Sequence, residues 1–178
     1  MRNTLKITFF AIMALGLFAC GEKKLTQEDL KKAEAMLFND DQTMNEAVAA
    51  QVAEKYIKFV EQSPDDPTAP TWLFHAFEIN VQTKNAEKSL ELGKKLVEQY
   101  PESSWAPRTL FLMANYVYDE QLHDLDKARE AYERLISDYP DSELADDAQK
   151  LIEYLGMTTE EIMTTIMMSK MEEEEGEW

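Results

Sequence analysis

The side chains that could do chemistry are few in this chain and stand far apart. His75 and His123 are not paired with each other at the His-x-x-x-His spacing of a helical metal site, and we expect the first in a helix and the second in a loop. The single cysteine, Cys20, excludes an intramolecular disulfide and a cysteine-based zinc site. The five glycines form no glycine-rich phosphate loop. The sequence therefore predicts that the protein is not an enzyme and has neither a metal site nor a cofactor.

Acidic residues dominate the charge of the chain. It holds 35 acidic and 18 basic residues, for a formal charge of -17. Proteins bind nucleic acid through clustered cations, so nucleic acid is excluded as an expected partner. The lysines near the N-terminus, Lys23, Lys24, Lys31 and Lys32, are interpreted as ordinary solvated side chains.

The elements that must position any binding residues repeat along the chain. A Tyr-Pro-acid sequence at 100–102 returns at 139–141, and each copy has an alanine five residues after the proline. A weaker copy, Ser-Pro-Asp, stands at 63–65, so the prolines are 37 and then 39 residues apart. We expect His123 and Asp124, in a loop, to account for the two extra residues. A period of this length is typical of helical hairpin repeats.

Apolar residues recur at helical spacing on both sides of each proline. Proline cannot continue the helix before it but fits the first turn of the next one, where the acid that follows suits the positive end of the helix dipole. No segment has the alternation of a strand, so we predict an all-α domain over residues 26–171. Six helices should form three hairpins and two more should cap the stack: 26–38, 44–61, 68–81, 86–100, 104–118, 125–139, 142–155 and 158–171.

Residues of the last hairpin carry a resemblance to a known family. Ala128, Tyr132 and Pro140 stand at the spacing of the small, aromatic and proline positions of a tetratricopeptide repeat, and Ala114 matches the small position of its first helix. The resemblance covers about half of the chain, although Gly93 replaces the aromatic residue in the preceding copy. It implies hairpin repeats in a right-handed superhelix. The Tyr-Pro-acid sequence resembles in particular the repeats of bacterial envelope lipoproteins, such as the barrel-assembly machinery lipoprotein and the Tol-Pal associated cell-division coordinator.

The N-terminus has the pattern of a targeting segment. Two basic residues precede an apolar run at 7–19 that ends at Cys20. The run is too short for a membrane-spanning helix and predicts a signal peptide at 1–19. Leu17 and Ala19 before the cysteine resemble a bacterial lipobox, which implies cleavage before Cys20 and acylation of that residue with fatty acids such as palmitate.

The lipobox resemblance also implies a location. Acyl chains on the cysteine would hold the protein on a membrane, with residues 20–25 as a short tether. Gly21 is not the acidic residue that retains many such lipoproteins at the inner membrane, so the resemblance implies the outer membrane, facing the periplasm. The alternative is a plain signal peptide or short anchor with an incidental cysteine.

We expect a binding surface on the concave side of the stack. The first helix of each hairpin lines that side, where repeat proteins hold an extended peptide or a partner helix. Arg108 is the strongest candidate because it is a rare cation in an acidic repeat, whereas the alternative for the two tryptophans is packing between repeats. The full set of candidates is Trp72, His75, Glu78, Trp105, Arg108, Asn115 and Tyr118.

Two functions are consistent with these patterns. The first is a non-catalytic, membrane-anchored scaffold that binds other proteins of the cell envelope, with outer-membrane protein assembly or envelope maintenance as the implied setting. The second is a lipoprotein that binds a glycan or peptidoglycan fragment by stacking on Trp72 and Trp105. A buried structural tryptophan would not respond to a glycan titration, so tryptophan fluorescence distinguishes the two.

The last expected helix leaves two interpretations open. Its methionines, Met163, Met167, Met168 and Met171, favour a cap on the exposed apolar edge of the last repeat. The alternative is an adaptable surface for a partner, since methionine side chains are flexible. The acidic residues after it, 172–178, are predicted to be a solvated tail.

Overall fold

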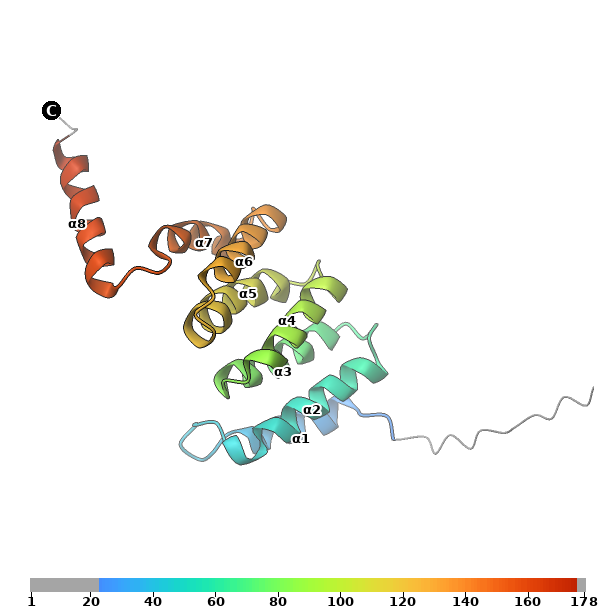
Figure 1. Ribbon diagram of the computed structural model, residues 1–178. Helices are drawn as coiled ribbons and strands as arrows, with labels where there is room; N and C mark the ends of the chain where they lie inside the picture. The colour runs from blue at the N-terminus through green and yellow to red at the C-terminus, as the bar shows by residue number, and fades with distance from the viewer. Residues whose placement is uncertain (1–22, 176–178) are drawn as a thin grey trace, which may run out of the picture.

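Eight α-helices and one π-helix follow one another along residues 23–175, the part that the computed structural model describes, and all but the last are stacked in chain order (Figure 1). Their bounds are α1 (Gln27–Leu37), α2 (Glu46–Gln62), α3 (Ala69–Gln82), α4 (Ala86–Gln99), α5 (Trp105–Leu112), η1 (Met113–Gln121), α6 (Leu125–Asp138), α7 (Glu143–Tyr154) and α8 (Thr159–Glu175). This part contains no β-strand, which confirms the predicted all-α class. Cys20 and the signal peptide expected at 1–19 lie outside the described residues.

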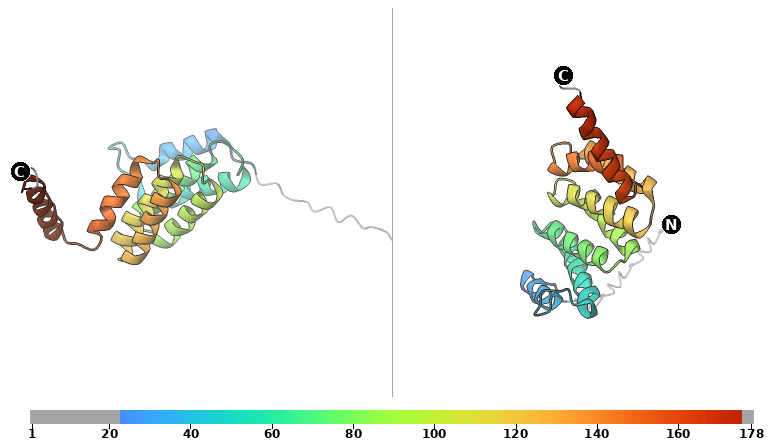
Figure 2. Two further views of the ribbon diagram at one scale, coloured as in Figure 1. Left: turned by 90° about the horizontal axis from the view of Figure 1, so that it is seen from above. Right: turned by 90° about the vertical axis from the view of Figure 1, so that its left-hand side faces the viewer.

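The helices form hairpins that stack on one another. α1 pairs with α2, α3 with α4, and the continuous α5–η1 segment with α6. Neighbouring hairpins meet because α2 packs against α3, and α4 packs against α5 and η1. The first helices of successive hairpins also touch, α3 with α5 and α5 with α7. The start of the described chain and α8 therefore lie at opposite ends of the stack, as both views of Figure 2 show.

Short side-chain hydrogen bonds to backbone N–H groups lie in the turns and caps at the starts of the helices. Two residues after each repeat proline, a side-chain oxygen accepts a bond from the backbone N–H two residues further on. The acceptors are Asp66, Ser103 and Ser142, and the N···O distances are 2.9, 3.2 and 3.3 Å. The second helices start after Asn85 and Asp124, whose side chains accept from the N–H three residues on, at 3.3 and 3.0 Å. These bonds satisfy N–H groups that have no partner inside the helix.

The core holds one aromatic position that recurs in two of the three hairpins. Tyr56 in α2 and Tyr132 in α6 each stand eight residues before a repeat proline and are almost fully buried. Burial raises the pKa of both phenols. The equivalent position in α4 is Gly93, where an added Cβ would lie 2.5 Å from the Sδ atom of Met113. The first residue of η1 thus supplies the bulk that the second hairpin lacks.

The two extra residues of the longer repeat lie inside a helix, so the expectation that His123 and Asp124 account for them is wrong. The turn at 122–124 has the same length as the turn at 83–85. Its middle residue, His123, is left-handed with φ 54°, just as Lys84 is with φ 56°. The difference lies in η1, because a π-helix closes each hydrogen bond one residue later than an α-helix, and two such turns take about two more residues.

The last two helices differ in how they relate to the stack. α7 packs against α6 and buries Ala145 and Ala148, so it covers the last hairpin. α8 projects away from the body (Figure 1), and Met163 and Met167 are 62 % and 64 % exposed. The expectation that the methionines of α8 cover the last repeat is therefore wrong. The helix also continues to Glu175, into the segment predicted to be a tail.

The turn between α7 and α8 requires a glycine. Gly156 has φ 82°, in the left-handed region that side chains disfavour. A Cβ at this position would also lie 2.8 Å from Cδ1 of Leu125. After the turn, Thr158 and Glu161 form a capping box, in which the backbone N–H of Thr158 donates to Oε2 of Glu161 at 2.7 Å and that of Glu161 donates to Oγ1 of Thr158 at 3.3 Å. The local sequence therefore starts α8 without help from the rest of the fold.

Candidate protein-binding groove

Three hollows follow one face of the stack, each between the first helices of neighbouring hairpins. The largest, with a volume of about 880 Å³, lies between α3 and the α5–η1 segment. One of about 200 Å³ lies between α1 and α3, and one of about 480 Å³ lies between η1 and α7. Glu78 and Gln82 line both the first and the second, so these two hollows form one groove across α3. This is the face on which the sequence places the binding residues.

The larger hollow combines apolar and charged side chains from its two walls. Those from α3 and its turn are Glu78 and Lys84, and those from α5 and η1 are Arg108, Leu112, Tyr116 and Glu120. Tyr116 is 40 % exposed, so a partner can reach it. An extended peptide offers both backbone polar groups and apolar side chains, and this mixture suits it.

Arg108 is positioned by aromatic rings. Its guanidinium carbon lies 5.8 Å from the centre of the Phe74 ring, within the range of a cation–π interaction. Phe74 in turn stacks on Trp105, with ring centres 4.3 Å apart. Among residues 23–175, no carboxylate forms an ion pair with Arg108. The N–H donors of this side chain are therefore available to a carboxylate or carbonyl of a bound segment.

A second polar group of the groove lacks a partner. Gln121, at the end of η1, donates from Nε2 to the carbonyl oxygen of Val81 at 3.0 Å and so ties η1 to α3. Its Oε1 is buried and accepts no hydrogen bond from any described residue. A buried acceptor without a donor costs about 1–3 kcal/mol.

Both tryptophans pack between hairpins. Trp72 is 7 % exposed, and its indole N–H donates to Oε1 of Gln27 at 2.9 Å. Trp105 is half-buried, lines none of the three hollows and donates to Oγ1 of Thr71 at 3.1 Å. Stacking on a sugar needs an open ring face, which Trp72 does not have. The prediction that Trp72 contacts a partner or a glycan is therefore wrong.

The other predicted residues are divided among the three hollows and the core. Glu78 and Arg108 line the larger hollow. His75 lines the smaller one, where its Nδ1 lies 3.2 Å from Oε2 of Glu78. Asn115 lines the third, between η1 and α7. Tyr118 is 8 % exposed and burial raises its pKa, so the prediction that it contacts a partner is wrong.

The π-helix explains why the sequence selected Tyr118 and missed Tyr116. In an α-helix, Asn115 and Tyr118 share the face of Arg108, because they follow it by two and three turns. The wider turns of η1 keep a spacing of four residues along that face, so Tyr116 and Glu120 line the groove instead. The longer separation of the last two prolines, 39 residues against 37, was the signal of this irregularity.

The described residues show neither a metal cluster nor a membrane-spanning helix. Between residues 23 and 175, no group of three or more histidine, cysteine, aspartate or glutamate side chains is arranged to hold a metal ion. None of the helices in that range combines the length and the hydropathy that a bilayer span requires.

The third hairpin holds one wall of the groove and decides what the fold is similar to. It places Arg108 near its start, Tyr116 and Gln121 in η1, and the buried Tyr132 in α6. Residues 108–142 match the tetratricopeptide repeat family. In the matched segment, the α5–η1 helix takes the place of the first helix of the repeat and α6 that of the second, and the match ends just after the proline turn.

The match and the helical stack together establish an all-α, tetratricopeptide-like fold. No curated protein matches the chain. Tetratricopeptide repeats bind other proteins on the face that their first helices form. The repeat therefore indicates a scaffold for protein–protein interaction, with the groove between α3 and η1 as its candidate site.

Proposed function

We propose that this protein is a non-catalytic scaffold that binds an extended segment of another protein in the groove between α3 and η1. One observation carries the proposal: a single hollow holds an arginine without a carboxylate partner beside the exposed ring of Tyr116. A peptide suits this hollow, since its carboxylate or carbonyl groups would bind Arg108 and its apolar side chains would pack on Leu112 and Tyr116. The tetratricopeptide match over residues 108–142 supports a protein as the partner.

Site-specific photo-crosslinking in cells tests the groove. A photoreactive amino acid replaces Tyr116 in the groove, or, as the matched control, the exposed Glu133 on α6, which lines none of the three hollows. We expect the probe at 116 to capture a protein that the probe at 133 does not, and mass spectrometry to identify it. Adding Arg108→Glu to the chain with the probe at 116 should reduce the captured amount at least tenfold.

Two outcomes would contradict this role. Equal capture from positions 116 and 133 would mean that the groove is not the contact surface. Capture of peptidoglycan fragments in place of protein would favour the glycan-binding alternative, which has lost the support of the buried Trp72.

We further propose that acylation of Cys20 anchors the scaffold in the bacterial envelope, at the outer membrane and facing the periplasm. The support is the lipobox-like sequence at 17–20 and the resemblance of the Tyr-Pro-acid repeats to those of envelope lipoproteins. The partner would then be an envelope protein engaged in outer-membrane protein assembly or envelope maintenance. α1 begins at Gln27, so the tether after Cys20 is short and keeps the groove near the membrane.

Fractionation of cells tests the anchor. We expect the unaltered chain in the membrane fraction and the Cys20→Ala chain in the soluble fraction of the envelope. If Cys20→Ala remained with the membranes, the lipid anchor would be excluded. Failure of the anchor proposal would leave the groove proposal intact, because binding of a peptide in the groove does not depend on acylation of Cys20.

A further inference from the structure

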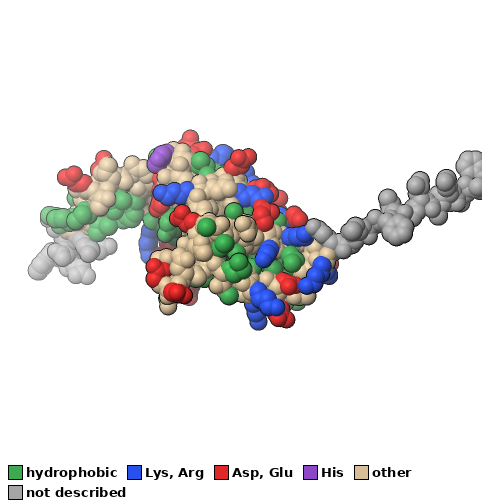
Figure 3. Space-filling view, turned by 90° about the horizontal axis from the view of Figure 1, so that it is seen from below, with side chains coloured by type: hydrophobic (Ala, Val, Ile, Leu, Met, Phe, Trp, Pro, Cys, Tyr) green, Lys and Arg blue, Asp and Glu red, His purple; other side chains and the backbone are tan. Residues whose placement is uncertain are grey.

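A second surface lies outside the groove, along α8. This helix makes hardly any contact with the rest of the stack. Figure 3 shows hydrophobic side chains gathered along the helix that projects at the left. Five large apolar residues of α8 are more than a third exposed: Met163, Ile166, Met167, Met168 and Met171. A row of this kind on one projecting helix marks an interaction surface.

The helix is stabilised at its start but not at its end. Glu160 and Glu161 stand in the first turn, where carboxylates interact favourably with the helix dipole. The last turn contains no basic residue, and the sequence places four glutamates at 172–175. Carboxylates at that end oppose the dipole and repel one another. A helix of 17 residues with hardly any tertiary contacts is marginal in water, so cations beside its last turns would stabilise it.

The negative charge around α8 indicates which kind of partner would bind its apolar surface. Residues 141–178 include 12 acidic and only 2 basic residues. A second copy of this chain would bring the same negative charge, and an anionic membrane would repel it as well. A cationic segment would be attracted by the negative charge of this part of the sequence.

We propose that α8 docks an amphipathic helix of another protein, with an apolar face for the methionines and lysine or arginine residues beside that face. Methionine side chains are flexible and adapt to the shape of an apolar partner. The surface is extended at the start of α8 by the hollow of about 480 Å³ between η1 and α7, where Leu151, Leu155 and Ile162 supply further apolar lining. Helices pack into apolar surfaces of this form through residues spaced three and four apart. The site is separate from the groove and does not depend on the proposed function.

A designed peptide pair tests the proposal on the purified full chain. The first peptide has leucines at helical spacing on one face and lysines at the remaining positions, and the second has glutamate in place of every lysine. Fluorescence anisotropy of the labelled peptides measures binding. We expect the lysine peptide to bind, its affinity to fall as salt is added, and the glutamate peptide to show at least tenfold weaker binding.

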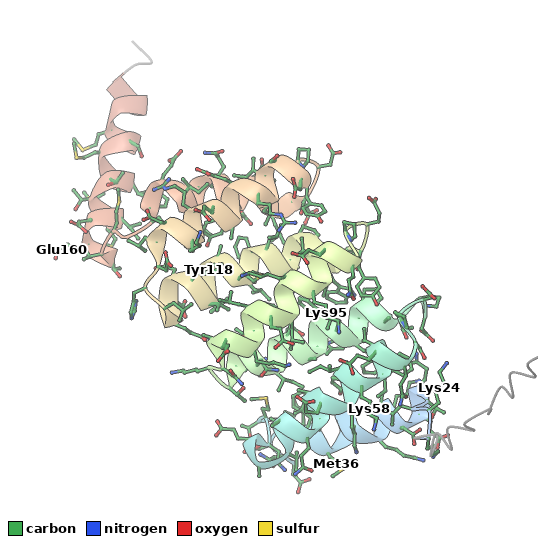
Figure 4. All side chains as sticks on the ribbon, turned by 45° about the vertical axis from the view of Figure 1, so that its right-hand side comes forward. Lys24, Met36, Lys58, Lys95, Tyr118 and Glu160 are labelled. Atoms are coloured by element: carbon green, nitrogen blue, oxygen red, sulfur yellow. The ribbon has the colours of Figure 1, made fainter. Side chains whose placement is uncertain are left out.

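Serine variants locate the contact. Met163→Ser combined with Met167→Ser should weaken the lysine peptide at least tenfold, and circular dichroism should show an unchanged fold because both side chains are exposed. Met36→Ser is the matched control, since Met36 is 53 % exposed on α1. Figure 4 places Met36 and Glu160, at the start of α8, at opposite ends of the molecule. This control should leave the affinity within twofold, and Arg108→Glu in the groove should do the same.

Three results would overturn the proposal. The first is equal affinity of the lysine peptide for the double serine variant and the unaltered chain. The second is equal affinity of the lysine and glutamate peptides. The third is a dimer in analytical ultracentrifugation that the double serine variant no longer forms, which would make a second copy the occupant of α8.

Discussion

The second and third hairpins share their turns and caps but fill their interiors differently. In the second, Gly93 leaves a space in α4 that the side chain of Met113 enters from η1. In the third, Tyr132 fills the equivalent space with its own ring, which meets Phe111 edge to face at 5.7 Å. In the second hairpin this space is filled by a residue of the next repeat, and in the third it is filled by a residue of the hairpin itself. Both hairpins therefore fill the space at this position, but they fill it with different residues.

Loss of the tyrosine ring should have the largest effect. Tyr132→Ala empties a space that the third hairpin fills from within, and we expect the free energy of unfolding to fall by about 3–5 kcal/mol. Urea unfolding followed by circular dichroism measures the change. Tyr116→Ala on the exposed face of η1 is the control and should cost far less. A loss below about 1 kcal/mol for Tyr132→Ala would mean that a neighbouring side chain can refill the space, as Met113 does in the second hairpin.

The reverse exchange should also destabilise the protein. Gly93→Tyr gives the second hairpin the residue of the other two, but its ring collides with Met113, and we expect a loss of about 1–3 kcal/mol. Met113→Ala removes the collision, so the double variant should be more stable than the sum of the two single effects predicts. Additive effects in urea unfolding would show that Gly93 and Met113 do not share one space.

The caps of the second helices should behave alike in the two hairpins. Asn85→Ala and Asp124→Ala each remove one hydrogen bond to a backbone N–H, and we expect each to lower the free energy of unfolding by about 1 kcal/mol. Thermal unfolding of both variants measures this. If one substitution cost more than twice as much as the other, the turns at 83–85 and 122–124 would not be equivalent.

The smallest effect concerns acid. Side-chain and backbone hydrogen bonds from Thr68 hold the pKa of Asp66 below its ordinary value of 3.8, whereas the equivalent residues of the later hairpins, Ser103 and Ser142, do not ionise. A lowered pKa stabilises the fold above pH 3.8, and that contribution is lost as the pH falls through the lower value in the folded state. Asp66→Ser should therefore reduce the loss of melting temperature on acidification. An unchanged pH profile would contradict this role of Asp66.

The helices could be predicted because their signals are local. Prolines, capping residues and apolar spacing act within a few positions, so the predicted helices agree with the observed ones to within a few residues at most ends. Arg108 was found for a similar reason, since a cation in an acidic repeat is visible in the sequence. Gln121 was not found, because its hydrogen bond joins residues 40 positions apart.

The π-helix and the projecting α8 could not be predicted, because both depend on packing. The proline spacing shows that two residues are added, but only the structure places them within η1, because the turn at 122–124 has the same length as the turn at 83–85. The methionines of α8 have the same spacing in a covered helix as in an exposed one. Their pattern therefore cannot decide between a cap and a free surface, which the position of α8 does.

The dependence of Gly93 on Met113 also sets an order for folding during synthesis. Each helix packs mainly on its neighbours in sequence, so a growing chain can fold from its N-terminal end as helices emerge. The second hairpin is the exception, because α4 remains underpacked until η1 has been made. The third hairpin carries its own aromatic residue and needs only α6 to fill the same position. The second repeat is therefore expected to be protected from unfolding only after η1 of the third repeat has been synthesised.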